Sequence, residues 1–496
     1  MRRLVLCLPL TLAAQPALAL EASFSTSQRV FAQSLSEEVL VSQDFRARTS
    51  TLTADRFEYQ FFLSAALDHR PVDALGLHFG VSSGLVAFSH DGAFGDGLPL
   101  ADHAKRTLFL GRVSAELELG ETGVFELELG RLREDVGRGL IYDAYAFGLV
   151  ADADLGLLPE RWPWHLRLAG LVPDGSFFSA PAPNPLVSLE VELEVLDDVS
   201  TALILAAYFD NGQGVTPFFA EAAWRDRIRA LTELVGDRPL VLEVLEAGHD
   251  AGKIAYDVDT LGELLFVGLA LDGAIDPVVF SGAVVAELGS FSLRSTPNGS
   301  LVRAVERAGR RLPAIQAVRA TILEPRETEV AVRSAMAQLE IDVRASRVFS
   351  FGGFAVLATG DDATLDRTFS SYIGLAPRLG YTSLFFSGGV SSTLVSPSVV
   401  SVAPDGAGVF AVGARAALRP ARALKAELTL AFISSLVGSE GGQVLGEEAD
   451  LDVELRLGAG FSATLSLAAF RSGPYYGDLP LGSQGILGLS YEVSSR

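Results

Sequence analysis

The stretch that decides the fold runs from Pro185 to Asp198 and reads Pro-Leu-Val-Ser-Leu-Glu-Val-Glu-Leu-Glu-Val-Leu-Asp-Asp. Its aliphatic residues share one parity from Val187 to Val195, and its carboxylates, ending at Glu194, share the other. Successive side chains of a strand point to opposite faces, so this pattern predicts one apolar and one ionic face. Neighbouring carboxylates repel each other unless water or basic partners surround them. A β-sandwich could show one polar face, but repetition of the pattern favours a barrel with lipid outside and water inside.

The same alternation recurs along the chain, in segments whose length suits tilted strands that cross a bilayer. Hydrophobic residues make up 49% of the sequence, yet no apolar run beyond the N-terminus is long enough for a membrane helix. Both observations predict an all-β protein: a single transmembrane, antiparallel, up-and-down β-barrel. The clearest alternating segments are 57–67, 75–81, 113–119, 125–129, 164–168, 187–195, 337–343, 412–418, 424–432 and 451–455.

The connections between these segments alternate between short and long, as in outer-membrane barrels with tight periplasmic turns and long outer loops. The segments bounded by these connections give seventeen strands. If both termini are periplasmic, one more strand must come first, and residues 38–47 are the candidate, which makes eighteen. Sixteen strands are the alternative. Short turns are predicted near 68–74, 120–123, 157–162, 197–200, 273–277, 345–347, 420–423 and 458–460. Longer segments are predicted at 88–106, 134–141, 172–185, 211–261, 294–332, 360–410, 437–448 and 471–484.

The N-terminus has the composition of a secretory signal peptide. Met1-Arg2-Arg3 precedes an apolar run over 4–14, and Ala17-Leu18-Ala19 is a small-residue cleavage site. The run is shorter than the ~20 residues of a spanning helix, which disfavours the alternative of a membrane anchor. We therefore expect a signal peptide at 1–19 and a barrel at 20–496, located in the bacterial outer membrane. Cys7, the single cysteine, would leave with the signal, so the mature chain would have no disulfide.

The mature chain is strongly acidic. Without Arg2 and Arg3 it keeps 37 basic against 61 acidic residues, a net charge of −24. Such a charge argues against a nucleic-acid partner. The expected partners are outer-membrane lipid, lipopolysaccharide and small polar or charged solutes.

Two of the long outer segments are predicted to be partly helical. Residues 218–235, within an insertion at about 211–261, and residues 301–319, within one at about 294–332, repeat near a period of 3.6. They could fold into the lumen as a constriction or plug, or decorate the surface as solvated loops. Residues 303–311 hold the densest basic cluster, which could line the pore mouth or bind anionic lipopolysaccharide.

Charged residues at the ends and on the polar parity of these strands are the candidate pore lining. Their acids and arginines could pair and leave a mixed-charge lumen. The candidates are Glu116, Glu118, Glu126, Glu128, Arg131, Arg133, Arg167, Glu190, Glu192, Glu194, Glu340, Asp342, Arg344, Arg415, Arg419, Asp452, Glu454 and Arg456.

Several motifs then resemble a known family. Residues 130–134 (Gly-Arg-Leu-Arg-Glu) end a strand ahead of 137–143 (Gly-Arg-Gly-Leu-Ile-Tyr-Asp), and 358–362 read Ala-Thr-Gly-Asp-Asp. With 448–453 and 470–474, this order is similar to the alginate-export family of outer-membrane β-barrels. The resemblance implies an eighteen-stranded monomer, and the family's namesake passes a polyanionic polysaccharide through an arginine-rich constriction. The many inward glutamates of this chain depart from that pattern and argue against a polyuronate.

No catalytic or cofactor motif stands out. The sequence lacks the Gly-x-x-x-x-Gly-Lys and His-Glu-x-x-His patterns. The six histidines have no neighbours at metal-ligand spacing, and the carboxylates at Asp361, Asp362 and Asp366 could bind calcium or form a solvated acidic loop. We expect no enzyme, no metal and no cofactor, although a barrel lipase needs only a serine and a histidine brought together on the wall.

The resulting functional prediction is an outer-membrane channel for passive passage or export of polar or charged solutes, with a polysaccharide as one possible class. The alternative is a non-conducting structural or adhesive barrel with a plugged lumen.

Overall fold

A computed structural model gives the arrangement of most of the chain. The residues that it describes are 20–34, 55–72, 74–82, 86–89, 109–119, 124–157, 162–173, 184–196, 198–212, 215, 219, 227, 256–310, 313–361, 367–375, 381–382, 384–385, 400–401, 406–439, 442–476 and 481–495. The predicted signal peptide at 1–19 and the predicted strand at 38–47 lie outside these ranges.

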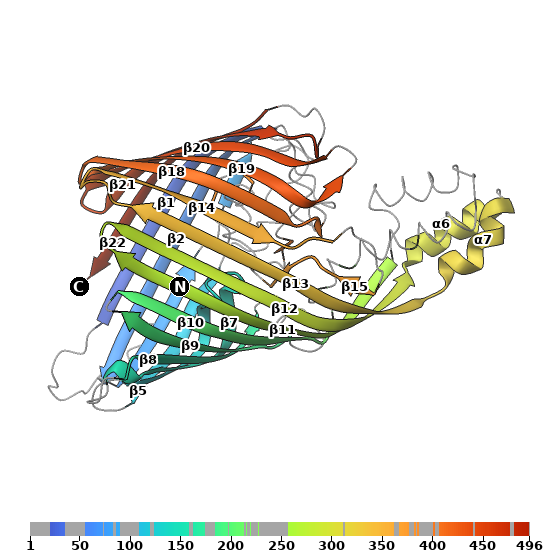
Figure 1. Cartoon of the computed structure of the whole chain (residues 1–496), viewed down its shortest axis with the longest axis horizontal. Coiled ribbons are helices and arrows are strands. Elements are labelled where there is room, and N and C mark those ends of the chain that lie inside the picture. The colour runs from blue at the N-terminus through green and yellow to red at the C-terminus, as the bar shows by residue number, and fades with distance from the viewer. Residues whose placement is uncertain are drawn as a thin grey trace, which may run out of the picture.

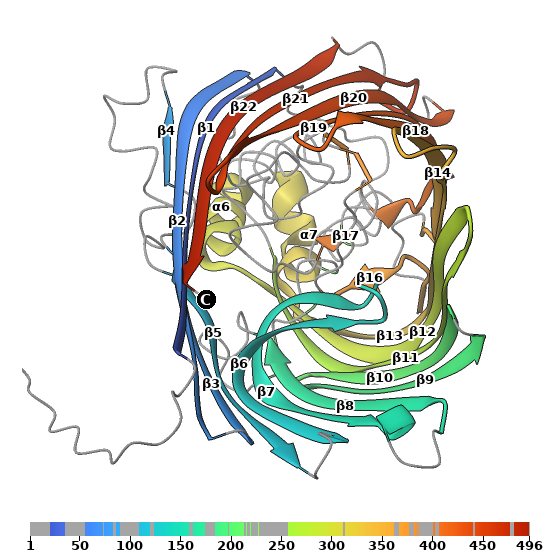
Figure 2. The ribbon, with the colours of Figure 1, turned by 90° about the vertical axis from the view of Figure 1, so that its left-hand side faces the viewer.

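Eighteen antiparallel strands form a closed barrel, which confirms the predicted fold class (Figures 1 and 2). Each strand pairs with the next along the chain, and the first and last strands close the ring through thirteen residue pairs, from Ala22–Ser495 to Ser34–Ser483. The strands are β1 (Leu20–Ser34), β2 (Asp55–Val72), β3 (Leu75–Ser82), β5 (Phe109–Leu119), β6 (Phe125–Val136), β7 (Tyr142–Asp154), β8 (Trp164–Pro173), β9 (Leu186–Leu196), β10 (Val199–Asp210), β11 (Tyr256–Ile275), β12 (Val278–Pro297), β13 (Arg326–Val343), β14 (Phe349–Ala358), β18 (Val409–Ala421), β19 (Leu424–Ser439), β20 (Gly442–Gly458), β21 (Phe461–Ser472) and β22 (Gly482–Ser495).

The first strand differs from the prediction. β1 begins at Leu20 and pairs with both β2 and β22, so it occupies the place that we assigned to residues 38–47. The middle of its inward face carries Ser23, Ser25 and Ser27, and the polar Thr26 and Gln28 share the parity of its outward residues, which made its alternation less visible in the sequence. Four short pieces complete the sheets: β4 (Val86–Ser89), which extends β3 along β2, β15 (Thr368–Phe369) beside β13, and the pair β16 (Ile373–Gly374) and β17 (Val400–Ser401).

Where they are described, the short turns lie where the sequence predicts them, at one end of the barrel; the predicted turn at 120–123 lies outside the described residues. The loop predicted at 437–448 is wrong, because β19 and β20 continue outward to pair Ser439 with Gly442. The predicted loop at 134–141 is also shorter than expected, since β6 extends to Val136 and β7 begins at Tyr142. In both segments the strands stay paired through polar residues and glycines. These residues interrupt the alternation of apolar and polar side chains, so the sequence pattern predicted a loop.

The outer surface of the barrel is apolar, as the opening stretch predicts. Val187, Leu189 and Leu451 are 43%, 37% and 36% exposed, although they sit in the middle of paired strands. No second layer covers them within the described chain, so they face lipid, and the barrel belongs in the outer membrane. In the part of the chain that the structure describes, no helix has both the length and the hydrophobicity to cross a bilayer.

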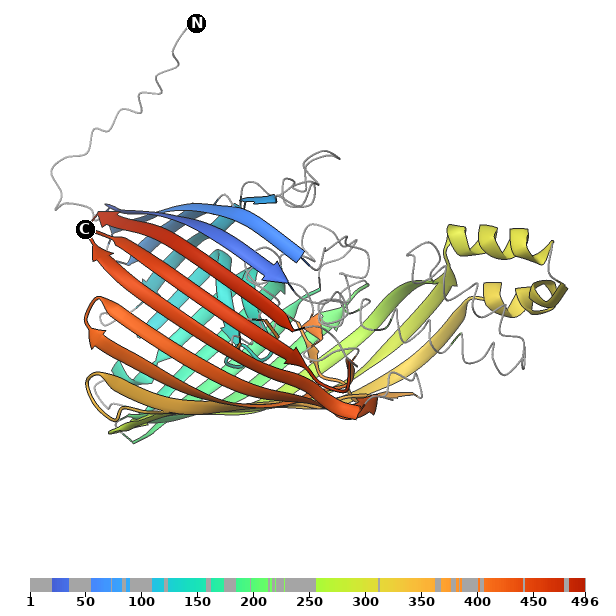
Figure 3. The same cartoon turned by 90° about the horizontal axis from the view of Figure 1, so that it is seen from above.

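Three strands rise beyond the long-loop end and carry two helices. β11, β12 and β13 are 20, 20 and 18 residues long, and α6 (Gly299–Gly309) and α7 (Pro313–Leu323) lie at their far end (Figures 1 and 3). The helices confirm the predicted helical stretch at 301–319. They stand outside the barrel, so they do not form the constriction that the sequence left open.

The helical hairpin is anchored at both ends. The Asn298 side chain accepts a hydrogen bond from the Leu301 amide and caps α6. At the other end, the buried Arg227 guanidinium donates to the carbonyls of Thr321 and Glu324 and lies over the Tyr256 ring. Of the other predicted helical stretch, 218–235, only Phe219 and Arg227 are described, and both are helical.

Candidate functional site: the lumen

The β6–β7 hairpin leaves the wall and bends into the barrel. Pairing of β5 with β6 ends at Val113–Arg131, and pairing of β7 with β8 ends at Ala146–Pro173. β6 and β7 remain paired with each other as far as Val136–Tyr142. Figure 2 shows the freed hairpin curled inside the ring of strands.

Two paired glycines make this bend possible. Gly130 lies opposite Gly148 and has a φ of 146°, a backbone conformation that side chains disfavour. A Cβ on Gly130 would stand 2.2 Å from the Val113 carbonyl oxygen, and one on Gly148 would stand 2.3 Å from that of Gly170. The neighbouring strands therefore approach the hairpin so closely at these two positions that only glycine fits.

The bent hairpin covers an apolar part of the inner wall. Leu132 and Leu140 of the hairpin belong to one buried cluster with Ile204 of β10, Phe266 of β11 and Val285 of β12. The prediction of an ionic inner face is thus wrong for this sector. Apolar residues are stable inside the barrel here because the hairpin excludes water from them.

Polar contacts fix the hairpin tip across the wall. The Gly137 amide donates to Glu190 at 2.9 Å, and Arg138 forms an ion pair with Asp272 at 2.7 Å. The side-chain amide of Gln338, on β13, donates to the Arg138 carbonyl at 3.2 Å. The tip therefore spans the inner surface from β9 to β13.

The loop between β14 and β18 packs against the hairpin from the other side. The Tyr372 hydroxyl donates to the Leu140 carbonyl at 3.1 Å, and the Leu375 amide donates to the Ile141 carbonyl at 3.1 Å. These two inward elements narrow the lumen, and each supports the other.

Two buried glutamates of the wall hold this loop in place. Glu448, on β20, accepts the amides of Leu384 at 2.6 Å and Phe385 at 2.9 Å. Glu287, on β12, accepts the Ile373 amide at 3.0 Å and also the Ser334 hydroxyl. Hydrogen bonds to a carboxylate are the stronger kind, so these contacts act as clamps on the loop backbone.

A tyrosine adds a third attachment. Tyr381 stacks on Phe354 with ring centroids 4.7 Å apart, and its hydroxyl donates to the Gln338 side chain at 2.5 Å. Burial, together with the nearby Glu340 carboxylate, raises the pKa of the Tyr381 hydroxyl. The hydroxyl therefore keeps the proton that it donates.

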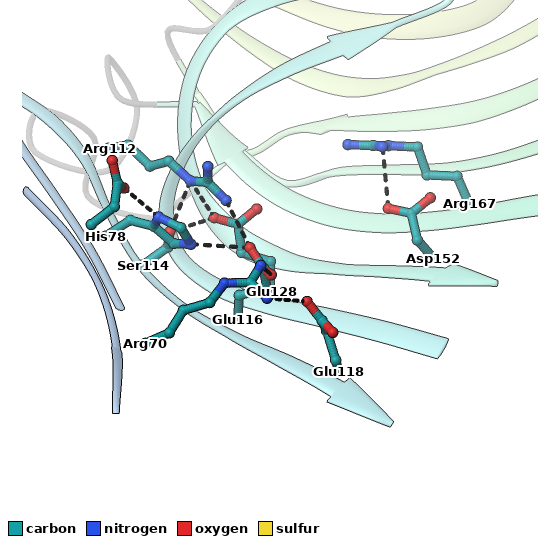
Figure 4. A network of polar contacts seen from close by, with 10 residues as sticks. Arg70, His78, Arg112, Ser114, Glu116, Glu118, Glu128, Asp152 and Arg167 are labelled. Carbon is teal, nitrogen blue, oxygen red and sulfur yellow. Dashed lines mark hydrogen bonds and ion pairs between the residues drawn. The ribbon is translucent and has the colours of Figure 1, made fainter. Parts of the chain in front are cut away.

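The opposite sector of the wall is charged, and its side chains are paired (Figure 4). Glu116 is the centre: it accepts from Arg70 and His78, each at 3.0 Å, and Arg112 lies 3.5 Å away. Around it, Arg70 binds Glu118 at 2.7 Å, Arg112 binds Glu128 at 2.7 Å, Ser114 donates to Glu128, and His78 contacts Asp68 at 2.6 Å. The network joins β2, β3, β5 and β6.

Two further arginines connect strands across the inner wall. Arg167, on β8, binds Glu134 at 2.6 Å and Asp152 at 3.1 Å. Arg415, on β18, binds Glu340 at 2.6 Å and Asp342 at 2.7 Å on β13. This is the mixed-charge pairing that the sequence allowed without assigning partners.

Most of the predicted pore-lining residues occupy the alternate strand positions that point into the barrel. Arg131 and Arg133 share the parity of Leu129 on β6: Arg131 is buried over the Tyr145 ring, and Arg133 lies on the freed hairpin inside the ring, where it binds Asp143 at 2.9 Å. The others lie on inward strand positions or at the short-turn rim: Glu116, Glu118, Glu126, Glu128, Arg167, Glu190, Glu192, Glu194, Glu340, Asp342, Arg344, Arg415, Arg419, Asp452, Glu454 and Arg456. Their role in lining a conducting pore stays a prediction.

The predicted set missed several inward partners. Arg70, His78, Arg112 and Asp152 share the parity of the predicted acids, so the alternation could have included them. Arg138 lies on the hairpin tip with a φ of 53°, and no strand pattern places it. Of the candidate calcium ligands, Asp361 accepts the Ser370 amide, while Asp362 and Asp366 lie outside the described residues. The described residues contain no group of three or more potential metal ligands.

These observations define the class of protein: an eighteen-stranded outer-membrane β-barrel that closes within one chain and is narrowed by inward loops. No family model and no curated protein sequence matches the chain. Solved outer-membrane barrels match it in fold. OccK9 (OpdG) of Pseudomonas aeruginosa has 12% identity and a TM-score of 0.50 over 96% of this chain and 98% of that one.

Two other solved barrels match at similar length. OpdL of Pseudomonas aeruginosa has 10% identity and a TM-score of 0.49, over 97% of this chain and 99% of that one. OccAB4 of Acinetobacter baumannii has 10% identity and a TM-score of 0.47, over 96% and 98%. The match to OccK9 supports the β-barrel fold, and it does not single out the alginate-export family.

Proposed function

We propose that this protein is an outer-membrane channel through which small polar or charged solutes pass passively, without covalent chemistry. One observation carries the proposal: paired charged side chains inside the barrel remain exposed to solvent. The Arg70 and Arg112 side chains are 48% and 41% exposed, although both lie on the inner face of a closed wall. Water therefore reaches the charged sector, as passage of polar solutes requires.

Single-channel recording in planar bilayers tests this function. We expect steady open-channel steps from the folded barrel, with heat-denatured protein as the control. Silence from protein that is correctly folded and inserted would contradict a channel.

The second candidate is a closed barrel. It is favoured by a specific observation, namely that the β6–β7 hairpin and the β14–β18 loop both fold inward and bind each other. The same recordings separate the two functions, because a plugged barrel conducts only after these elements are loosened.

A polysaccharide is the narrower form of the proposal, suggested by the resemblance to the alginate-export family. Oligosaccharides of graded charge test it: a sugar that travels through the lumen interrupts the ion current while it resides there. If neither neutral nor acidic oligosaccharides interrupt the current, the polysaccharide form is wrong and the channel proposal stands.

A further inference from the structure

Basic side chains gather at the short-turn end of one sector of the barrel. Residues of three neighbouring hairpins line a pocket of about 320 Å³ there. Its charged lining consists of Arg347, Arg419, Arg422, Lys425, Arg456 and Glu454. Such a group of cations is unusual in a chain whose net charge is −22.

Backbone hydrogen bonds hold the pocket in shape. The Arg419 amide donates to the Val348 carbonyl at 2.7 Å, which joins the start of the β18–β19 turn to the β13–β14 turn. The Arg456 amide donates to the Ala423 carbonyl at 2.7 Å, which joins β20 to the same turn. The cations are therefore brought together by the wall itself and not by a bound partner.

Two of the pocket's arginines lie on the inner face of the wall. Leu418 and Leu455 are 46% and 39% exposed on the lipid face, and the residues that follow them, Arg419 and Arg456, have the opposite parity. Because the short turns mark the periplasmic end, a solute meets this pocket at the periplasmic mouth.

The cations outnumber the carboxylates that neutralise them. Lys425 binds Glu427 at 2.7 Å and Arg456 binds Glu454 at 2.9 Å. In the described part of the chain, Arg347, Arg419 and Arg422 form no ion pair. Three guanidinium groups that share one pocket repel one another, and an anion between them would remove that repulsion. Guanidinium also matches the geometry of phosphate and carboxylate oxygens.

We propose that this pocket binds small solutes that carry two or more negative charges on phosphate or carboxylate groups. Its volume lies at the lower end of small-molecule sites, which are roughly 300–1,000 Å³. Binding itself needs only the folded barrel, whereas a role in passage rests on the proposed channel function.

Calorimetric titration of the detergent-solubilised barrel with inorganic pyrophosphate at low salt tests the site. The double variant Arg347→Ser/Arg422→Ser removes two exposed turn cations and leaves the wall intact. We expect it to raise the Kd for pyrophosphate about tenfold or more. The matched control, Arg303→Ser/Arg307→Ser, removes two cations from α6 at the far end and leaves the Kd unchanged.

Three outcomes would overturn the pocket: no binding to the unmodified barrel, no weakening by the turn variant, or equal weakening by both variants. Bilayer recordings separate this inference from the channel itself. Pyrophosphate added on the periplasmic side should reduce the current more than the same addition outside. Binding without any conductance would support the pocket and overturn only the channel. Conductance without binding would support the channel and overturn only the pocket.

Discussion

Single residues decide whether the inward elements stay in the lumen. Glu448 and Glu287 are fully or almost fully buried, and each gives its carboxylate to backbone amides of the β14–β18 loop. A buried amide that loses such a partner costs roughly 1–3 kcal/mol. The loop is therefore bound by contacts that one substitution can remove.

We expect Glu448→Gln to loosen the loop and increase the single-channel conductance. A side-chain amide has one acceptor oxygen, so it cannot hold the Leu384 and Phe385 amides as the carboxylate does. The expected loss is about 1–3 kcal/mol of loop attachment. Glu447→Gln, at the exposed neighbouring position, is the matched control. Equal conductance of the Glu448 variant and the control would show that the clamp does not restrict the lumen.

Gly130 controls the bend of the β6–β7 hairpin. We expect Gly130→Ala to destabilise the barrel by about 1–3 kcal/mol, because its φ is 146° and the new Cβ would meet the Val113 carbonyl. Urea unfolding in lipid vesicles measures the change. Gly170→Ala is the control: its Cβ would meet nothing within 4 Å, so the change should stay within about 0.5 kcal/mol. An unperturbed Gly130 variant would contradict the geometry of the bend.

At the scale of elements, the two inward segments and the two helices have different roles. The β6–β7 hairpin and β14–β18 loop pack inside the ring, whereas α6 and α7 lie beyond it (Figures 2 and 3). α6 directs Leu301 and Val305 into its packed side and leaves Arg303 and Arg307 exposed. The predicted binding of its basic face to lipopolysaccharide is untested and does not depend on the pore.

Replacing residues 299–319 with a short Gly-Ser linker tests this division. The deletion keeps Thr321 and Glu324, whose carbonyls bind Arg227, so the strands beneath should remain packed. We expect unchanged conductance and an unchanged unfolding temperature of the barrel. A clear rise in conductance would mean that the helices reach into the conducting path.

At the scale of the whole molecule, charge is divided between sectors. Acids exceed cations in the network around Glu116, and cations exceed acids in the pocket around Arg419. The chain as a whole is strongly acidic. Along most of its length, the lumen should therefore favour cations over anions.

We expect the reversal potential in a salt gradient to show cation preference. The preference should weaken at high salt, because the Debye length falls from about 10 Å at 0.1 M to about 3 Å at 1 M. Glu116→Gln should reduce it, while Glu329→Gln, on the outward face of β13, should not. Anion preference in the unmodified protein would show that the basic rim dominates the current.

Local patterns were enough to predict the barrel. The alternation from Val187 to Val195 reflects lipid on one face of the strand and water on the other. The alternation of short and long connections reflects the two ends of the barrel. Both signals span about ten residues, so a single sequence contains them in full. β1 escaped because the polar Thr26 and Gln28 share the parity of its apolar outward residues, so its two faces contrast weakly.

The interior was decided by tertiary structure. Tyr372 meets Leu140 across 232 positions of sequence, and Gln338 meets Arg138 across 200. Such contacts exist only after the ring closes and brings distant strands to one enclosed space. The sequence by itself determined a barrel wetted by lipid outside, because parity is a local property; which charges pair, which sector is dry and what narrows the lumen depend on closure.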